Sequence, residues 1–109
     1  MALDETGFER KAEAMLARLS AAVEEQLADQ VDVEFQGGIV TIELDDGRQY
    51  VINKHAPNRQ IWLSSPVSGA WHFAWNEGRE AWISTREPAQ LDDLLAQELG
   101  AATGADLAL

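Results

Sequence analysis

The sequence contains no cysteine, and this absence excludes several kinds of chemistry at once. Without thiols there is no disulfide framework, no thiolate zinc site and no cysteine nucleophile. A chain of 109 residues must therefore be held together by its apolar core. At this length one compact domain buries enough surface to do so. A reducing compartment is allowed by the lack of cysteine, though it is not proved by it.

Basic residues are also scarce, with 8 Lys and Arg against 19 Asp and Glu and a formal net charge of −11. Such a chain is repelled by phosphate backbones and anionic lipids, so neither nucleic acid nor a membrane surface is an expected partner. No run approaches the roughly 20 apolar residues of a spanning helix, and the first residues contain no signal-length apolar run. We expect a cytoplasmic protein, unless a targeting segment has been removed.

Motifs of known catalytic chemistry are missing as well. The two histidines, His55 and His72, have no neighbour at the spacing of a metal site or a catalytic triad. No glycine-rich phosphate loop and no H-E-x-x-H sequence occurs. The run 45–47, Asp-Asp-Gly, resembles half of a calcium loop, but the other ligand positions are not acidic, and a tight turn is the better interpretation.

The pattern of apolar residues predicts the fold. Apolar residues recur at helical spacing over 8–23, and the period changes to two from residue 31 onward. Turn signals then separate six short strands, with links too short for parallel crossovers. A closing helix begins near Pro88 and is capped by Gly100, after which the tail 101–109 is expected to fray. The prediction is one domain over 1–109, of class α+β: a two-layer α-β sandwich of order α-β6-α, with an antiparallel sheet and both helices on one face.

Negative charge gathers in the first half of the chain, where residues 1–46 hold twelve acids and three bases. Carboxylates crowded without His or Cys would bind cations such as Fe³⁺, Mn²⁺, Ca²⁺ or Fe²⁺ loosely and with little selectivity. The alternative is a solvated helix face that serves solubility. The candidate metal ligands on the first helix, the following turn and the first strand are Asp4, Glu5, Glu9, Glu13, Glu24, Glu25, Asp29, Asp32 and Glu34.

Trp62 is the second candidate for function. Strict alternation places Ile61 and Leu63 inward, so Trp62 is expected on the face that the helices leave bare, near Arg59. Trp and Arg are common anchors of protein interfaces. The alternative is a tryptophan that only packs on its neighbours in the sheet.

The stretch 50–69, YVINKHAPNRQIWLSSPVSG, resembles the signature of the frataxin family, and the resemblance extends over nearly the whole chain. The acidic first helix, the hairpin at Gly37-Gly38, the positions of Trp75 and Trp82 and the leucine-rich last helix all occur in the family's order. The resemblance implies an α-β sandwich that acts in iron-sulfur cluster assembly. It implies weak iron binding at an acidic ridge and docking on the cysteine desulfurase and scaffold complex.

The resemblance also implies which residues make contact with those partners. The sheet contact would comprise Asn53, Asn58, Gln60 and Trp62, with Arg59 beside them. His72 stands where mitochondrial members tend to carry a basic residue, so a contact there would depend on pH. The ridge is thinner than in many relatives, because Ala28, Gln30 and Val31 interrupt it. Without iron, the protein is expected to be a monomer.

Three functions remain open from the sequence. The first is an iron-binding protein that donates iron to cluster assembly, or regulates it, by docking through its acidic ridge and Trp62. The second is iron oxidation or storage at the carboxylate cluster, although paired-metal oxidases usually use Glu-x-x-His motifs and this chain has none. The third is an acidic interaction module whose metal binding is incidental.

Overall fold

The computed structural model describes residues 3–109. Helix α1 spans Glu5–Leu27 and extends beyond the predicted stretch 8–23 at both ends. It begins after Asp4, whose carboxylate accepts a hydrogen bond from the Gly7 N–H at 2.7 Å and so caps the helix. Its buried stripe runs from Phe8 to Leu27 at the three- and four-residue spacing that the sequence indicates.

Six strands follow in a single antiparallel sheet, and their order in space is their order in the chain. Every neighbouring pair is antiparallel, as the short connections predict. A short 3₁₀ turn, η1, at Ala56–Asn58 joins the third and fourth strands. The strands are β1 Val31–Gln36, β2 Ile39–Leu44, β3 Gln49–His55, β4 Gln60–Ser65, β5 Gly69–Asn76 and β6 Ala81–Ser84.

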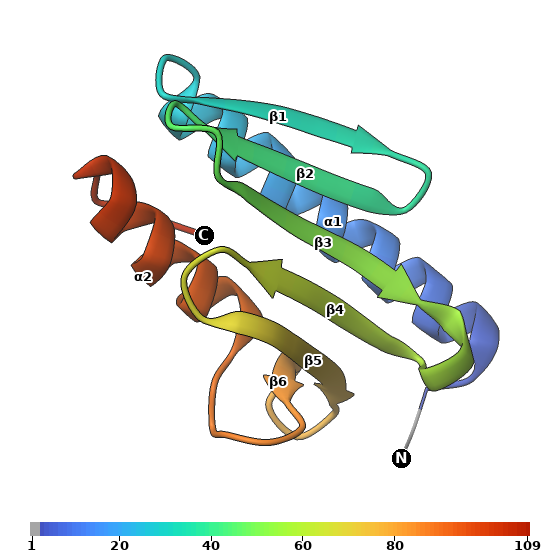
Figure 1. Ribbon diagram of the computed structural model, residues 1–109. Coiled ribbons are helices and arrows are strands. Elements are labelled where there is room, and N and C mark those ends of the chain that lie inside the picture. Colours follow the sequence, from blue (N-terminus) through green and yellow to red (C-terminus); the bar gives the residue numbers. More distant parts are fainter. Residues whose placement is uncertain (1–2) are drawn as a thin grey trace.

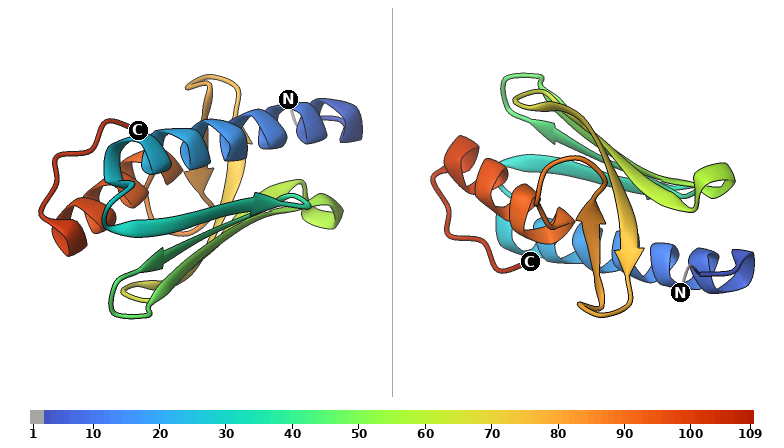
Figure 2. Two further views of the ribbon diagram at one scale, coloured as in Figure 1. Left: turned by 90° about the horizontal axis from the view of Figure 1, so that it is seen from above. Right: turned by 90° about the horizontal axis from the view of Figure 1, so that it is seen from below.

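The helices cover one face of this sheet and leave the other bare, which confirms the predicted sandwich (Figures 1 and 2). The core lies between the two layers, where alternate strand residues such as Ile42, Ile52 and Phe73 are fully buried against both helices. We call the uncovered side the open face. Within residues 3–109, neither helix is long and apolar enough to cross a membrane.

Helix α2, Leu91–Thr103, differs from the prediction at both ends. It begins after Gln90 rather than at Pro88, because Gln90 still bridges to Ile83 of β6. It continues through Gly100 and ends at Gly104, whose φ of 76° is the left-handed conformation of a helix C-cap. The predicted cap at Gly100 is therefore wrong. Gly100 instead allows a close approach, since a Cβ there would lie 2.9 Å from the Ala105 carbonyl oxygen.

The expected fraying of 101–109 also differs from the structure. Residues 101–103 belong to α2, and the segment after Gly104 turns back across α1 (Figure 2). The Gln26 side chain both donates to and accepts from the backbone of Ala108, at 2.9 and 3.0 Å. Leu107 and Leu109 pack against the core. The tail is therefore held against the rest of the protein by the packing of these leucines and by the hydrogen bonds to Gln26.

The inward residues of β1 are covered unevenly. Val31 is buried, Val33 is half-buried and Phe35 is 37% exposed. The reason is geometric: α1 lies over the start of β1 and diverges from it towards the end of the strand (Figure 1). At the other edge of the sheet, Trp82 points into the core and is 1% exposed, whereas Ile83 is half-buried.

Candidate functional site

Trp62 lies on the open face, as alternation along β4 predicts. Its neighbours Ile61 and Leu63 are buried beneath the helices, while Trp62 itself is half-buried. The indole N–H donates a hydrogen bond of 2.8 Å to the side-chain oxygen of Gln60. The one polar atom of the indole is therefore satisfied within the protein, and the rest of its exposed surface is apolar.

Two imidazole rings sandwich the Trp62 indole. His55 stacks on one side with ring centroids 3.6 Å apart, and His72 on the other with centroids 4.2 Å apart. The interplanar angles are 9° and 11°, so the three rings are nearly parallel. Trp62 thus presents its edge to solvent in a fixed orientation. The sequence pattern and the family resemblance predicted contact residues around this indole, His72 among them, but missed His55.

The register of the sheet explains why these residues meet. Asn53 on β3 lies directly opposite Trp62, and Trp62 lies opposite His72 on β5. His55 is opposite Gln60, which lies two residues before Trp62 on the same face of β4. His55 is therefore a diagonal neighbour of the indole. Four of the six predicted contact residues thus share one patch of the open face: Asn53, Gln60, Trp62 and His72.

The other two predicted contact residues lie at the end of that patch. Asn58 closes η1, and Arg59 follows it with a φ of 50°, the left-handed conformation. The same row of the sheet also contains Ile39 of β2, which is opposite Asn53 and 43% exposed. Alternation along β2 is the signal that would have added Ile39 to the predicted contact residues.

The predicted metal ligands do not form one cluster. Asp4 caps α1 and Glu5, Glu9 and Glu13 lie on its first part, and no acid follows on this helix until Glu24. Glu24 lies eleven positions after Glu13 along the helix, a rise of about 16 Å. The acids therefore form a leading group at 4–13 and a trailing group comprising Glu24, Glu25, Asp29, Asp32 and Glu34.

The leading group contains its own cation. Lys54 of β3 reaches across to α1 and pairs with Glu9 at 2.5 Å and with Glu13 at 3.0 Å. Hydrogen bonds to these two carboxylates raise the pKa of Lys54 above its ordinary value. Gly38 makes room for the contact, since a Cβ there would lie 2.6 Å from the Lys54 side chain. A metal ion at Glu9 and Glu13 must compete with this ammonium.

The trailing group has no such partner. Among residues 3–109, no ion pair involves Glu24, Glu25, Asp29, Asp32 or Glu34. In the same part of the chain, no three Asp, Glu or His side chains lie close enough together to hold a metal ion. The carboxylates can thus attract a hydrated cation or a basic surface, without forming a closed coordination site.

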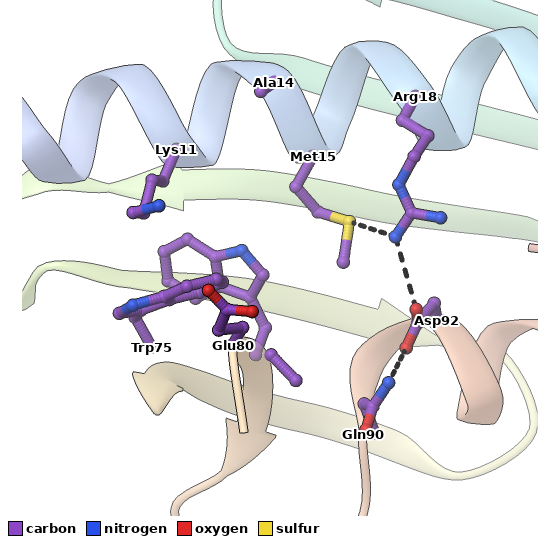
Figure 3. A pocket seen from close by; sticks show the side chains of 10 residues that line it. Lys11, Ala14, Met15, Arg18, Trp75, Glu80, Gln90 and Asp92 are labelled. Carbon is purple, nitrogen blue, oxygen red and sulfur yellow. Dashed lines mark hydrogen bonds and ion pairs between the residues drawn. The ribbon is translucent and has the colours of Figure 1, made fainter. Parts of the chain in front are cut away.

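A separate pocket of about 290 Å³ lies on the helix side, between α1 and the β5–β6 hairpin (Figure 3). The Lys11 ammonium lies 4.5 Å from the centroid of a ring of Trp75, and Arg18 pairs with Asp92 at 3.2 Å. Glu80 also lines it, so two cationic side chains from α1 face two carboxylates on the opposite wall (Figure 3). Because the charges of both signs balance, the pocket has no preference for a cation. It lies on the helix side of the sheet, whereas Trp62 lies on the open face.

Comparison with known proteins identifies similar chains. A family model described as a frataxin-like domain matches residues 1–105. Two similar proteins are the iron-sulfur cluster assembly protein CyaY of Vibrio cholerae, at 41% identity over 88% of both chains, and its namesake from Neisseria meningitidis, at 35% identity over 94% of this chain and 92% of the other.

Solved structures give the same result. A frataxin from Psychromonas ingrahamii superposes with a TM-score of 0.84 over 96% of both chains at 21% identity, which is a likeness of fold alone. A trimeric frataxin from Saccharomyces cerevisiae complexed with ferrous iron superposes with a TM-score of 0.71 at 36% identity, covering 96% of this chain and 90% of that one.

Proposed function

The chain belongs to the frataxin family, and on this premise we propose that it acts in iron-sulfur cluster assembly as an iron-binding protein that supplies iron or regulates the process. Its partners in this proposal are a cysteine desulfurase and the scaffold protein on which clusters form. Relatives named for cluster assembly, and a relative in complex with ferrous iron, support this assignment.

The observation that carries the docking half of the proposal is the stack of Trp62 between His55 and His72 on the open face. An aromatic side chain held in one orientation loses little freedom on binding, so it can anchor a partner. Asn53 and Gln60 beside it supply hydrogen-bonding groups. We assign this patch to the scaffold and desulfurase complex.

The acidic groups carry the iron-binding half. Iron is the cargo here, bound through one or two carboxylates and water, because oxygen ligands suit a hard cation. The trailing group is the stronger candidate, since its carboxylates have no cation of their own among residues 3–109. The same negative surface would attract the basic surface of a desulfurase. Iron oxidation at a paired-metal site gains no separate support from this arrangement.

Two experiments test the two halves separately. Trp62→Ala is expected to weaken binding to the desulfurase–scaffold complex by roughly thirtyfold, which corresponds to a hot-spot loss of about 2 kcal/mol. Val67→Ala, which truncates another exposed apolar residue, is the matched control. Unchanged affinity in Trp62→Ala would remove the docking proposal. Fe²⁺ titration followed by amide NMR should give localised shifts within 24–34, and their absence would remove the iron-binding proposal.

A further inference from the structure

Strand β1 is an open edge of the sheet. It pairs with β2 alone, because the sheet runs in order from β1 to β6. The opposite edge is covered, since Gln90 bridges to Ile83 and Ser84 N–H donates to the Ala89 carbonyl at 2.8 Å. An uncovered edge strand offers unpaired backbone groups to another chain. The question is which residues of β1 offer them and what could pair there.

The geometry of the β1–β2 hairpin determines which backbone groups of β1 point away from β2. Gly37 and Gly38 have φ values of 60° and 75°, typical of a two-residue turn, and Gln36 lies opposite Ile39. The pair that closes such a turn exchanges both hydrogen bonds, and bonded pairs then alternate along the ladder. Glu34 and Asp32 therefore direct their backbone groups towards β2. Val33 and Phe35 direct their N–H and C=O groups outward.

The side chains on the helix side of β1 leave an apolar groove. Val33 and Phe35 line a groove of about 550 Å³ together with Ala21 of α1. Phe35 is 37% exposed there, whereas Phe8 and Phe73 are fully buried. Glu24 and Glu25 also line the groove. A bound peptide could place an apolar side chain against Val33 and Phe35 and a neighbouring Lys or Arg against these two carboxylates.

The side chains on the open face of β1 are acidic. Asp32 lies opposite Glu43 of β2, and Glu34 lies opposite Thr41. Like charges directly opposite each other destabilise a sheet, and no ion pair in residues 3–109 relieves them. A strand added beside β1 would place every second side chain next to these carboxylates.

We propose that β1 is a docking edge for an extended segment of a partner protein in which apolar and basic residues alternate. The backbone of that segment pairs with Val33 and Phe35. Its apolar side chains enter the groove beside Phe35, and its Lys or Arg side chains lie against Asp32 and Glu34. A second copy of this chain is the poorer occupant, because its own β1 would bring two further acids to the same place.

This inference goes beyond the proposed function, since it needs neither iron nor Trp62, although it uses carboxylates of the same trailing group. The test uses the full chain and a seven-residue blocked peptide in which Lys and Val alternate. We expect binding to slow hydrogen exchange at the Val33 and Phe35 amides and to shift the β1 resonances. The same peptide, N-methylated on the residues that face β1, keeps its charge and composition but loses those donors. It should bind at least about tenfold more weakly.

Variants of β1 provide the second measurement. Val33→Pro removes one outward N–H and leaves the ladder to β2 intact, so it should also weaken peptide binding about tenfold. Asp32→Asn and Glu34→Gln should weaken binding, whereas Glu87→Gln, an exposed acid elsewhere, should not. Urea unfolding checks that each variant is folded. If Val33→Pro does not fold, the N-methylated peptide on the unmodified chain decides.

Three results would overturn the inference. The first is equal binding of the N-methylated peptide, which would mean attraction by charge alone. The second is absence of peptide binding, or protection confined to residues outside β1. The third is concentration-dependent dimerisation with protection of Val33 and Phe35, which would make a second copy the occupant. The Trp62→Ala experiment probes a different patch, and the Fe²⁺ titration is carried out without peptide. Failure of this inference is therefore distinguishable from failure of either half of the proposed function.

Discussion

The indole of Trp62 and the imidazole of His72 stack face to face, with ring centroids 4.2 Å apart and planes 11° from parallel. They lie directly opposite each other on β4 and β5, so the register of two strands creates the contact. His55 completes the stack from β3. The proposed interface anchor is thus a three-ring unit rather than a single exposed tryptophan.

His72→Ala should therefore weaken both stability and docking. Removing one ring of the stack is expected to lower the free energy of unfolding by about 0.5–1.5 kcal/mol. The Trp62 indole would gain freedom, and affinity for the desulfurase–scaffold complex should fall by less than in Trp62→Ala. Urea unfolding and the Trp62 indole N–H resonance measure these effects. Thr41→Ala, on the same face but outside the stack, is the control, and an equal loss there would contradict the interpretation.

Lys54→Met should expose the leading acidic group to cations. Glu9 and Glu13 would lose their ammonium partner, so a divalent cation should bind these carboxylates more tightly. Line broadening by Mn²⁺ of the amides near Glu9 measures this. The free energy of unfolding should fall by up to about 1 kcal/mol, since the pairs are partly exposed. Lys11→Met is the matched control, because Lys11 lies over Trp75 instead.

The pH dependence of this effect has a definite sign. The two carboxylates raise the pKa of Lys54, so the charged form is favoured in the folded protein. The stabilisation is fully present below the unfolded value of about 10.4 and is lost as the pH rises through the folded value. From neutral pH upward, the difference between the unmodified chain and Lys54→Met should therefore persist until strongly alkaline solution. A difference that disappears near neutral pH would contradict the ion-pair explanation.

Tyr50 offers a spectroscopic test, because it is the one tyrosine in the sequence. Burial, together with its hydrogen bond to Glu98, raises the pKa of Tyr50 to about 12. The unfolded chain releases this proton near pH 10, so the folded state binds more protons between the two values and stability falls as the pH rises. Phenolate absorbance should follow a folded titration near 12. Tyr50→Phe should remove this part of the alkaline loss, and titration near 10 in the folded chain would contradict it.

Gly100→Ala separates packing from helix propensity. Propensity alone predicts that alanine inside a helix is more stable than glycine by about 0.8–1 kcal/mol. Here the added Cβ would meet the Ala105 carbonyl oxygen at 2.9 Å, so the chain after Gly104 must shift. We expect a loss of about 1–3 kcal/mol in urea unfolding, as in other overpacked sites. Ala101→Gly, at an exposed position of α2, should follow propensity, and a stabilised Gly100→Ala would disprove the close approach.

Local pattern was sufficient for most of the fold. The period of two from Val31 onward, the Gly37-Gly38 turn and the leucine spacing of the last helix predict elements that the structure confirms. The C-terminal end of α2 was not predictable, because both Gly100 and Gly104 are residues that commonly cap a helix. The real role of Gly100 depends on how the chain turns after Gly104, which brings the Ala105 carbonyl oxygen against Gly100.

What the sequence determined by itself was the excess of negative charge, the α-β6-α order and the outward facing of Trp62, because each follows from composition or from a period along one segment. The tertiary structure alone decided which of those charges are already paired and what surrounds the indole. Lys54 meets Glu9 across more than forty residues, and His55 and His72 meet Trp62 through register. Such meetings depend on how separate strands and helices align, and no single segment encodes that alignment.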